Sequence, residues 1–124
     1  MSSVIAETRI TIGASIEKVW EIILDTANYH KWNPFVIRVE TEDDVTQEGA
    51  KMKLYVKWAN GKEDSSDEIV TDTKPPHVDS AGYKRAHWSY RFDGYLHYFG
   101  LVRATRYQWL EQQSDGTTNY HTRE

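Results

Sequence analysis

The chain contains no cysteine. Disulfides, thiolate nucleophiles and cysteine-ligated metal sites are therefore excluded. No apolar stretch approaches the roughly 20 residues that a membrane-spanning helix needs. The first residues, "MSSVIAETRITIG", lack the basic region and apolar run of a signal peptide. We therefore expect a soluble, cytoplasmic protein.

An excess of basic residues is also missing. The chain has 15 Lys and Arg residues against 19 Asp and Glu residues, which gives a formal net charge of -4. Proteins that bind nucleic acid normally present a basic face, so we expect no nucleic-acid partner. At 124 residues the chain is large enough for one core but not for two, which predicts a single domain spanning residues 1–124.

Motifs for metal or phosphate binding are lacking as well. There is no serine in a nucleophile elbow and no glycine-rich phosphate loop. The histidines have no spacing that would set two of them on one face as metal ligands. We expect no metal and no cofactor. The five histidines are His30, His77, His87, His97 and His121.

Aromatic residues, by contrast, are abundant, at 13% of the chain, with five Trp and eight Tyr against three Phe. Trp and Tyr combine a large apolar body with a polar tip, which suits a cavity for a partly polar organic ligand. A Trp-rich core with Tyr at the surface would give the same composition. Composition alone leaves both interpretations open.

The first third of the chain predicts one strand and two short helices. Apolar and polar residues alternate up to Ile12, which indicates a strand. Behind a candidate N-cap at Ser15, apolar residues recur at helical spacing over about ten residues. A second helical turn over residues 27–32 must end before Pro34, because the residue preceding a proline disfavours helical dihedrals. The apolar helix positions are Ile16, Val19, Trp20, Ile23 and Leu24.

The rest of the chain predicts strands only, so we expect the α+β class with a curved antiparallel sheet of about six to seven strands. Bulky residues favour one register in each strand. In the strand that ends near residue 112 this register points Arg103 inward, whereas the other register leaves Arg103 in solvent. The predicted inward residues are Met52, Leu54, Val56, Trp58, Ala86, Trp88, Tyr90, Phe92, Leu101, Arg103, Thr105, Tyr107 and Trp109.

The segment "ASIEKVWEIILDTANYHKWNPF" resembles the helix-grip superfamily of START-like and polyketide-cyclase-like domains (SRPBCC). Later segments, "KPPHVDSAGYK" and "GTTNYHTRE", are similar to the Pro-Pro entry into a strand and the Gly-Thr strand of that family, so the resemblance covers essentially the whole chain. The residues that carry the first motif are Ala14, Ser15, Val19, Trp20, Asp25, Tyr29, Trp32, Asn33, Pro34 and Phe35.

The resemblance implies a sheet gripping an N-terminal helix pair. Members of the family continue into a long C-terminal helix that closes a ligand cavity, and this helix is absent from the present chain, which stops at Glu124. Six strands make a sheet about 29 Å wide, whereas a ten-residue helix is about 15 Å long. We expect the uncovered face to form a homo-oligomer such as a dimer. A shortened chain, or a segment exchanged between two copies, remains open.

The inward registers and the resemblance together select candidate site residues. Arg103 is the candidate for stabilising negative charge, and His97, between two glycines, is the candidate general acid or base. A solvated Arg103 and a His97 without function are the plain alternatives. The candidate ligand-binding residues are Trp32, Asn33, Phe35, Leu54, Val56, Trp58, Trp88, Tyr90, Tyr107 and Trp109.

These residues predict the binding of a hydrophobic, partly polar small molecule, such as a polyketide or terpenoid of secondary metabolism. The resemblance implies cofactor-independent cyclisation, dehydration or isomerisation, in which the protein mainly positions a flexible substrate. Two other functions stay open: a non-catalytic carrier of lipids or metabolites, and a protein-interaction module that uses the open sheet face. The fold hosts all three.

Overall fold

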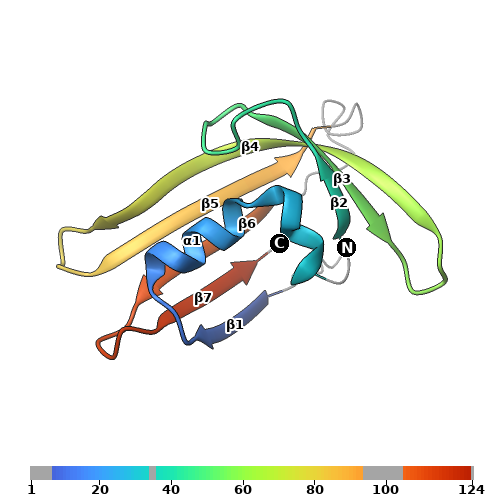
Figure 1. Ribbon diagram of the computed structural model, residues 1–124. Coiled ribbons are helices and arrows are strands. Elements are labelled where there is room, and N and C mark those ends of the chain that lie inside the picture. The colour runs from blue at the N-terminus through green and yellow to red at the C-terminus, as the bar shows by residue number, and fades with distance from the viewer. Residues whose placement is uncertain (1–6, 34–35, 94–104, 124) are drawn as a thin grey trace, which may run out of the picture.

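A computed structural model describes residues 7–33, 36–93 and 105–123. Among these residues, seven strands form one antiparallel sheet in the order β1-β7-β6-β5-β4-β3-β2. The sheet is strongly curved, and the helices lie on its concave side (Figure 1). The elements are β1 (Glu7–Ile12), α1 (Ile16–Leu24), the 3-10 helix η1 (Thr26–Lys31), β2 (Val36–Glu40), β3 (Lys51–Lys57), β4 (Glu63–Val78), β5 (Lys84–Phe92), β6 (Thr105–Gln112) and β7 (Thr118–Arg123).

This arrangement confirms the predicted α+β class and the helix-grip layout of a curved antiparallel sheet with two N-terminal helices. Helix α1 begins where expected, because the Ser15 hydroxyl accepts a hydrogen bond from the Lys18 backbone N–H at 3.3 Å. One face of α1 buries Ile16, Val19 and Ile23 against the sheet. The amphipathic pattern in the sequence therefore fixes how the helix sits on the concave face.

Replacing Ser15 with alanine is expected to lower the free energy of unfolding by about 1 kcal/mol, because the first turn of α1 loses its cap. Urea denaturation of the purified protein measures this change. Ser80→Ala, at an exposed turn, is the matched control. Equal stability of the two variants would show that the cap contributes nothing.

The corner between η1 and β2 is structural. The Asn33 side-chain oxygen accepts a hydrogen bond from the Val36 backbone N–H at 3.1 Å and so directs the chain into β2. Tyr29, on η1, is buried, and its ring contacts Trp32 with 4.5 Å between centroids. Phe35 lies outside the described residues. Asn33 therefore positions the backbone, whatever else it contacts.

The predicted inward registers are confirmed for β3, where Met52, Leu54 and Val56 are buried, and for β5, where Ala86, Trp88 and Tyr90 are buried. Trp58 follows the end of β3 and is 49% exposed, so its predicted inward position is wrong.

The register predicted for β6 is wrong. Trp88 lies directly opposite Gln108, and Tyr90 lies opposite Arg106. Directly opposed residues share a face of the sheet, so Tyr107 and Trp109 lie on the convex face. Bulk was misleading here, because the concave side of β6 carries the polar residues Arg106 and Gln108 beside the buried Leu110. Arg103 lies outside the described residues.

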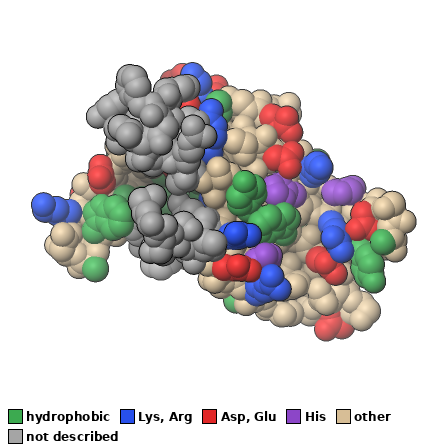
Figure 2. All heavy atoms as spheres, turned by 180° about the vertical axis from the view of Figure 1, so that it is seen from behind, with side chains coloured by type: hydrophobic (Ala, Val, Ile, Leu, Met, Phe, Trp, Pro, Cys, Tyr) green, Lys and Arg blue, Asp and Glu red, His purple; other side chains and the backbone are tan. Residues whose placement is uncertain are grey.

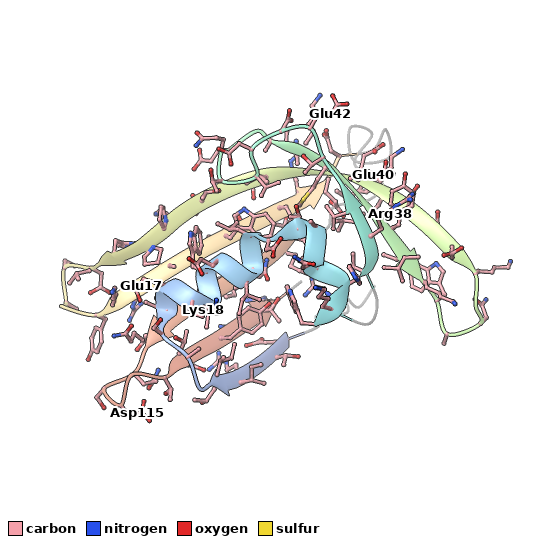
Figure 3. All side chains as sticks on the ribbon, viewed as in Figure 1. Glu17, Lys18, Arg38, Glu40, Glu42 and Asp115 are labelled. Atoms are coloured by element: carbon pink, nitrogen blue, oxygen red, sulfur yellow. The ribbon has the colours of Figure 1, made fainter. Side chains whose placement is uncertain are left out.

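Charged side chains lie on the helix, on the strands and in the turns. Figure 3 places Glu17 and Lys18 on the first turn of α1, Arg38 and Glu40 on β2, and Asp115 in the turn before β7. None of the helices among the described residues is long and apolar enough to cross a membrane.

Candidate functional site

An apolar groove runs along the concave side of the sheet, between the helices, the edge strand β1 and its neighbour β7. Its volume is about 270 Å³, and its walls are almost entirely hydrocarbon. Exposed apolar surface of this kind makes the groove a candidate binding surface, because burying it releases water. We call it the apolar groove; it is lined by Ile10, Ile12, Val19, Ile22, Ile23, Trp32 and Tyr120.

The sequence builds the groove from three simple patterns. Alternation along β1 turns Ile10 and Ile12 to the same side, and Ile10 pairs with Tyr120 across the edge of the sheet. Helical spacing along α1 places Ile22 at the border of the buried face, where its side chain lines the groove and is 42% exposed. Trp32, at the end of η1, is 38% exposed and closes one side.

Polar groups adjoin the groove at Tyr120, the groove residue that carries a hydroxyl. The Tyr120 hydroxyl donates a hydrogen bond to the Gln108 side-chain oxygen at 2.7 Å. Gln108 is 1% exposed, and its amide nitrogen finds no acceptor among the described residues. A buried donor without an acceptor is costly, so this position favours a ligand oxygen or a bound water.

A pair of phenols and a guanidinium lie beside this amide. The hydroxyls of Tyr29 and Tyr90 are 3.2 Å apart and buried. Arg106 lies opposite Tyr90 across the strands and donates a hydrogen bond to the Thr122 hydroxyl at 3.0 Å. Burial raises the pKa of Tyr90 and of Tyr120, and the positive charge of Arg106 opposes part of that rise. We call Tyr29, Tyr90, Arg106, Gln108 and Tyr120 the polar cluster.

Burial keeps these phenols protonated. It raises the pKa of Tyr90 well above its usual value, and the neighbouring Tyr29 adds to the rise. Burial likewise raises the pKa of Tyr120 to about 12. At neutral pH both side chains are therefore hydrogen-bond donors or acceptors and not phenolate bases. The chemistry available here is orientation and stabilisation of negative charge on a ligand oxygen.

The structure distributes the predicted site residues over several places. Trp32 lines the apolar groove, and Tyr90 belongs to the polar cluster. Leu54 and Val56 are core residues, and Trp88 is buried with its indole N–H donating to the Val45 carbonyl at 3.0 Å. Tyr107 and Trp109 lie on the convex face, as corrected above, Trp58 is exposed and Asn33 shapes a corner. His97, Arg103 and Phe35 lie outside the described residues.

Sequence reasoning missed most of the groove and of the polar cluster. Arg106 and Gln108 were overlooked because their strand was assigned by bulk to the other register. The signal that could have found them is the alternation of polar residues opposite Trp88 and Tyr90, but reading it requires the strand pairing. Among the residues that the structure describes, no three His, Asp or Glu side chains gather as a metal site.

The chain resembles known proteins in its sequence profile and in its fold. The sequence profile of a protein family described as polyketide cyclase/dehydrase and lipid transport matches residues 3–109. A comparison with curated proteins finds no match. Several solved structures resemble the chain at low sequence identity, which shows a shared fold.

The Zhui aromatase/cyclase from a Streptomyces species is 18% identical, with a TM-score of 0.63 over 96% of this chain and 64% of that one. A START superfamily protein from Mycobacterium smegmatis is 12% identical, with a TM-score of 0.60 over 96% of this chain and 73% of that one. The di-domain ARO/CYC BexL is 15% identical, with a TM-score of 0.63 over 98% of this chain. The chain spans only 35% of that two-domain protein.

Proposed function

Because this chain belongs to the polyketide cyclase/dehydrase and lipid transport family, we propose that its concave face binds a hydrophobic, partly polar small molecule. The observation that carries the proposal is the apolar groove, whose wall residue Tyr120 also belongs to the polar cluster. Hydrocarbon walls with a few convergent polar groups are the usual composition of a small-molecule site. The apolar part of the ligand lies between α1 and β1, and its oxygen atoms face Gln108 and Tyr120.

We extend the proposal to a reaction: cofactor-independent cyclisation or dehydration of a carbonyl-bearing chain. The groove holds the flexible substrate in one conformation, which lowers the entropic part of the barrier. The Arg106 guanidinium and the neutral phenols then stabilise negative charge that develops on a substrate oxygen. The family description and the aromatase/cyclase fold relatives support this class of reaction.

The second candidate is a carrier that returns its ligand unchanged, which the lipid-transport part of the family description favours. A time course separates the two. Incubation of the protein with a synthetic poly-β-ketone chain, followed by mass spectrometry, gives cyclised or dehydrated product for an enzyme. A carrier leaves the poly-β-ketone unchanged.

Binding itself is tested with dodecanoate and protein carrying ¹³C-labelled isoleucine methyl groups. We expect the methyl signals of Ile10, Ile12 and Ile22 to shift on titration, because they line the groove. Ile69 serves as the internal control. It precedes the buried Val70 on β4, so its side chain points to the opposite face of the sheet from the groove. Unchanged groove signals at saturating dodecanoate would refute the proposed site.

The same groove could instead be covered by a second copy of the chain, which is the predicted homo-oligomer. Light scattering of the ligand-free protein separates these occupants. A mass of one chain leaves the groove to the small molecule. A mass of two chains, together with groove methyl signals that do not respond to dodecanoate, would assign the groove to a subunit interface.

A further inference from the structure

A second hollow lies on the convex face of the sheet, on the opposite side from the apolar groove. Its volume is about 480 Å³, and its lining comes from β1, β4, β5, β6 and β7. Seen from behind, hydrophobic and histidine side chains gather in the middle of this face, with basic and acidic side chains around them (Figure 2). We call this hollow the convex-face pocket.

The floor of the convex-face pocket is one continuous row across five strands. The strand pairing places Lys74 opposite His87, His87 opposite Trp109, Trp109 opposite His121, and His121 opposite Arg9. Five strands at about 4.8 Å spacing make this row about 19 Å long. The order is therefore cation, imidazole, indole, imidazole, cation.

The aromatic rings of this row are in contact. The centroid of Trp109 lies 5.6 Å from that of His87 and 4.7 Å from that of His121. Tyr107 stacks on Trp109 with 5.4 Å between centroids and 7° between the ring planes. These neighbours hold the indole in one orientation, although Trp109 keeps part of its surface exposed. The result is a rigid aromatic platform in the pocket floor.

The acids around the platform face basic partners. Glu7 contacts His121 at 2.7 Å and Arg9 at 3.2 Å. Asp72 faces His87 at 3.5 Å, and burial lowers the pKa of His87 more than Asp72 raises it. Asp79 and Glu111 both pair with Arg85, at 3.0 and 3.5 Å.

Lys74 differs from the other cations of the pocket. It is exposed, and it makes no ion pair with an acid among the described residues. Its charge is close enough to His87 to oppose protonation of that ring. An ammonium without an acidic partner, next to an aromatic platform, fits an anion joined to a planar ring.

We propose that the convex-face pocket is a second binding site, for a planar aromatic anion such as an aryl carboxylate. The ring lies against the indole of Trp109, and the carboxylate meets the ammonium of Lys74. This site is separated by the sheet from the apolar groove, so it stands or falls independently of the proposed function.

The probe for this site is 2-naphthoate, titrated into ¹⁵N-labelled protein. We expect the indole N–H signal of Trp109 to shift, while that of Trp88, which is buried and bonded to Val45, stays in place. The neutral amide, 2-naphthamide, tests whether the negative charge matters. Assignment of the two indole signals comes from the Trp109→Phe and Trp88→Phe variants.

Lys74→Gln is expected to weaken 2-naphthoate binding by about three-fold, the size of a partly exposed ion contact. Lys57→Gln, an exposed strand lysine on β3, is the matched control and leaves the affinity unchanged. Trp109→Leu removes the platform and is expected to weaken binding by about ten-fold. Lys74→Gln keeps the test valid even where Trp109→Leu perturbs folding, because Lys74 is exposed.

Three results would overturn the second site. The Trp109 signal could stay unmoved while groove signals shift, which would place the aromatic anion on the concave face. The amide could bind as tightly as 2-naphthoate, which would remove the role of charge. Lys74→Gln could bind as tightly as Lys57→Gln, which would remove the role of Lys74.

Discussion

Replacing Trp88 with alanine is expected to lower the free energy of unfolding by about 4 kcal/mol. Trp88 is 1% exposed and packs on the concave face of β5, with its ring centroid 5.2 Å from that of Tyr90. Alanine leaves a cavity the size of an indole, which the surrounding sheet fills only in part. It also removes the hydrogen bond to the Val45 carbonyl, which ties the β2–β3 connection to the sheet.

Chemical denaturation measures this loss of unfolding free energy. Two further variants separate the contribution of burial from that of the hydrogen bond. Trp58→Ala removes the same side chain from a position that is 49% exposed, so we expect a loss of about 1 kcal/mol or less. Trp88→Phe keeps most of the packing and removes the hydrogen bond, leaving the Val45 carbonyl without that donor. Losses of equal size for Trp88→Ala and Trp58→Ala would show that Trp88 does not anchor the core.

Local patterns predicted the fold because each of them is decided within a few residues. Helical spacing placed Ile16, Val19 and Ile23 on the buried face of α1. Alternation placed Met52 and Leu54 on the buried face of β3. In both elements the apolar face is the one that leaves water, so the pattern and the burial agree.

Strand β6 shows where this logic stops. Its bulky residues Tyr107 and Trp109 suggested the buried face, but the concave side of β6 holds Arg106 and Gln108 together with Leu110. The polar residues find partners there: Gln108 accepts from Tyr120, and Arg106 donates to Thr122. A one-residue change of register exchanges the two faces, and only the pairing with β5 decides it.

The candidate site was less predictable because it is assembled from distant segments. Tyr29 and Tyr90 are 61 residues apart in the chain and yet 3.2 Å apart at their hydroxyls. Ile10 and Ile22 line one groove only because β1 pairs with β7 beneath α1. No local pattern encodes such proximity. Trp32 was predicted as a ligand contact from the resemblance, and its place in the groove keeps that prediction open to test.

Ile22→Asp is expected to weaken dodecanoate binding by at least about ten-fold, because a carboxylate then faces the hydrocarbon wall and the ligand chain. Ile22 is 42% exposed in the free protein, so the substitution is expected to cost about 1 kcal/mol or less in unfolding free energy. Binding and folding are thereby separated: affinity is measured by isothermal titration, and stability by urea denaturation on the same sample.

Two further variants connect this loss of affinity to the groove itself. Lys18→Asp places the same carboxylate elsewhere on α1. The Lys18 side chain is 63% exposed and does not line the groove, so dodecanoate affinity is expected to stay unchanged. Ile22→Val keeps the wall apolar and is expected to bind within about two-fold of the original protein. If Ile22→Asp binds dodecanoate as tightly as Lys18→Asp does, the apolar groove is not the binding site, and the polar cluster beside it loses its assigned role.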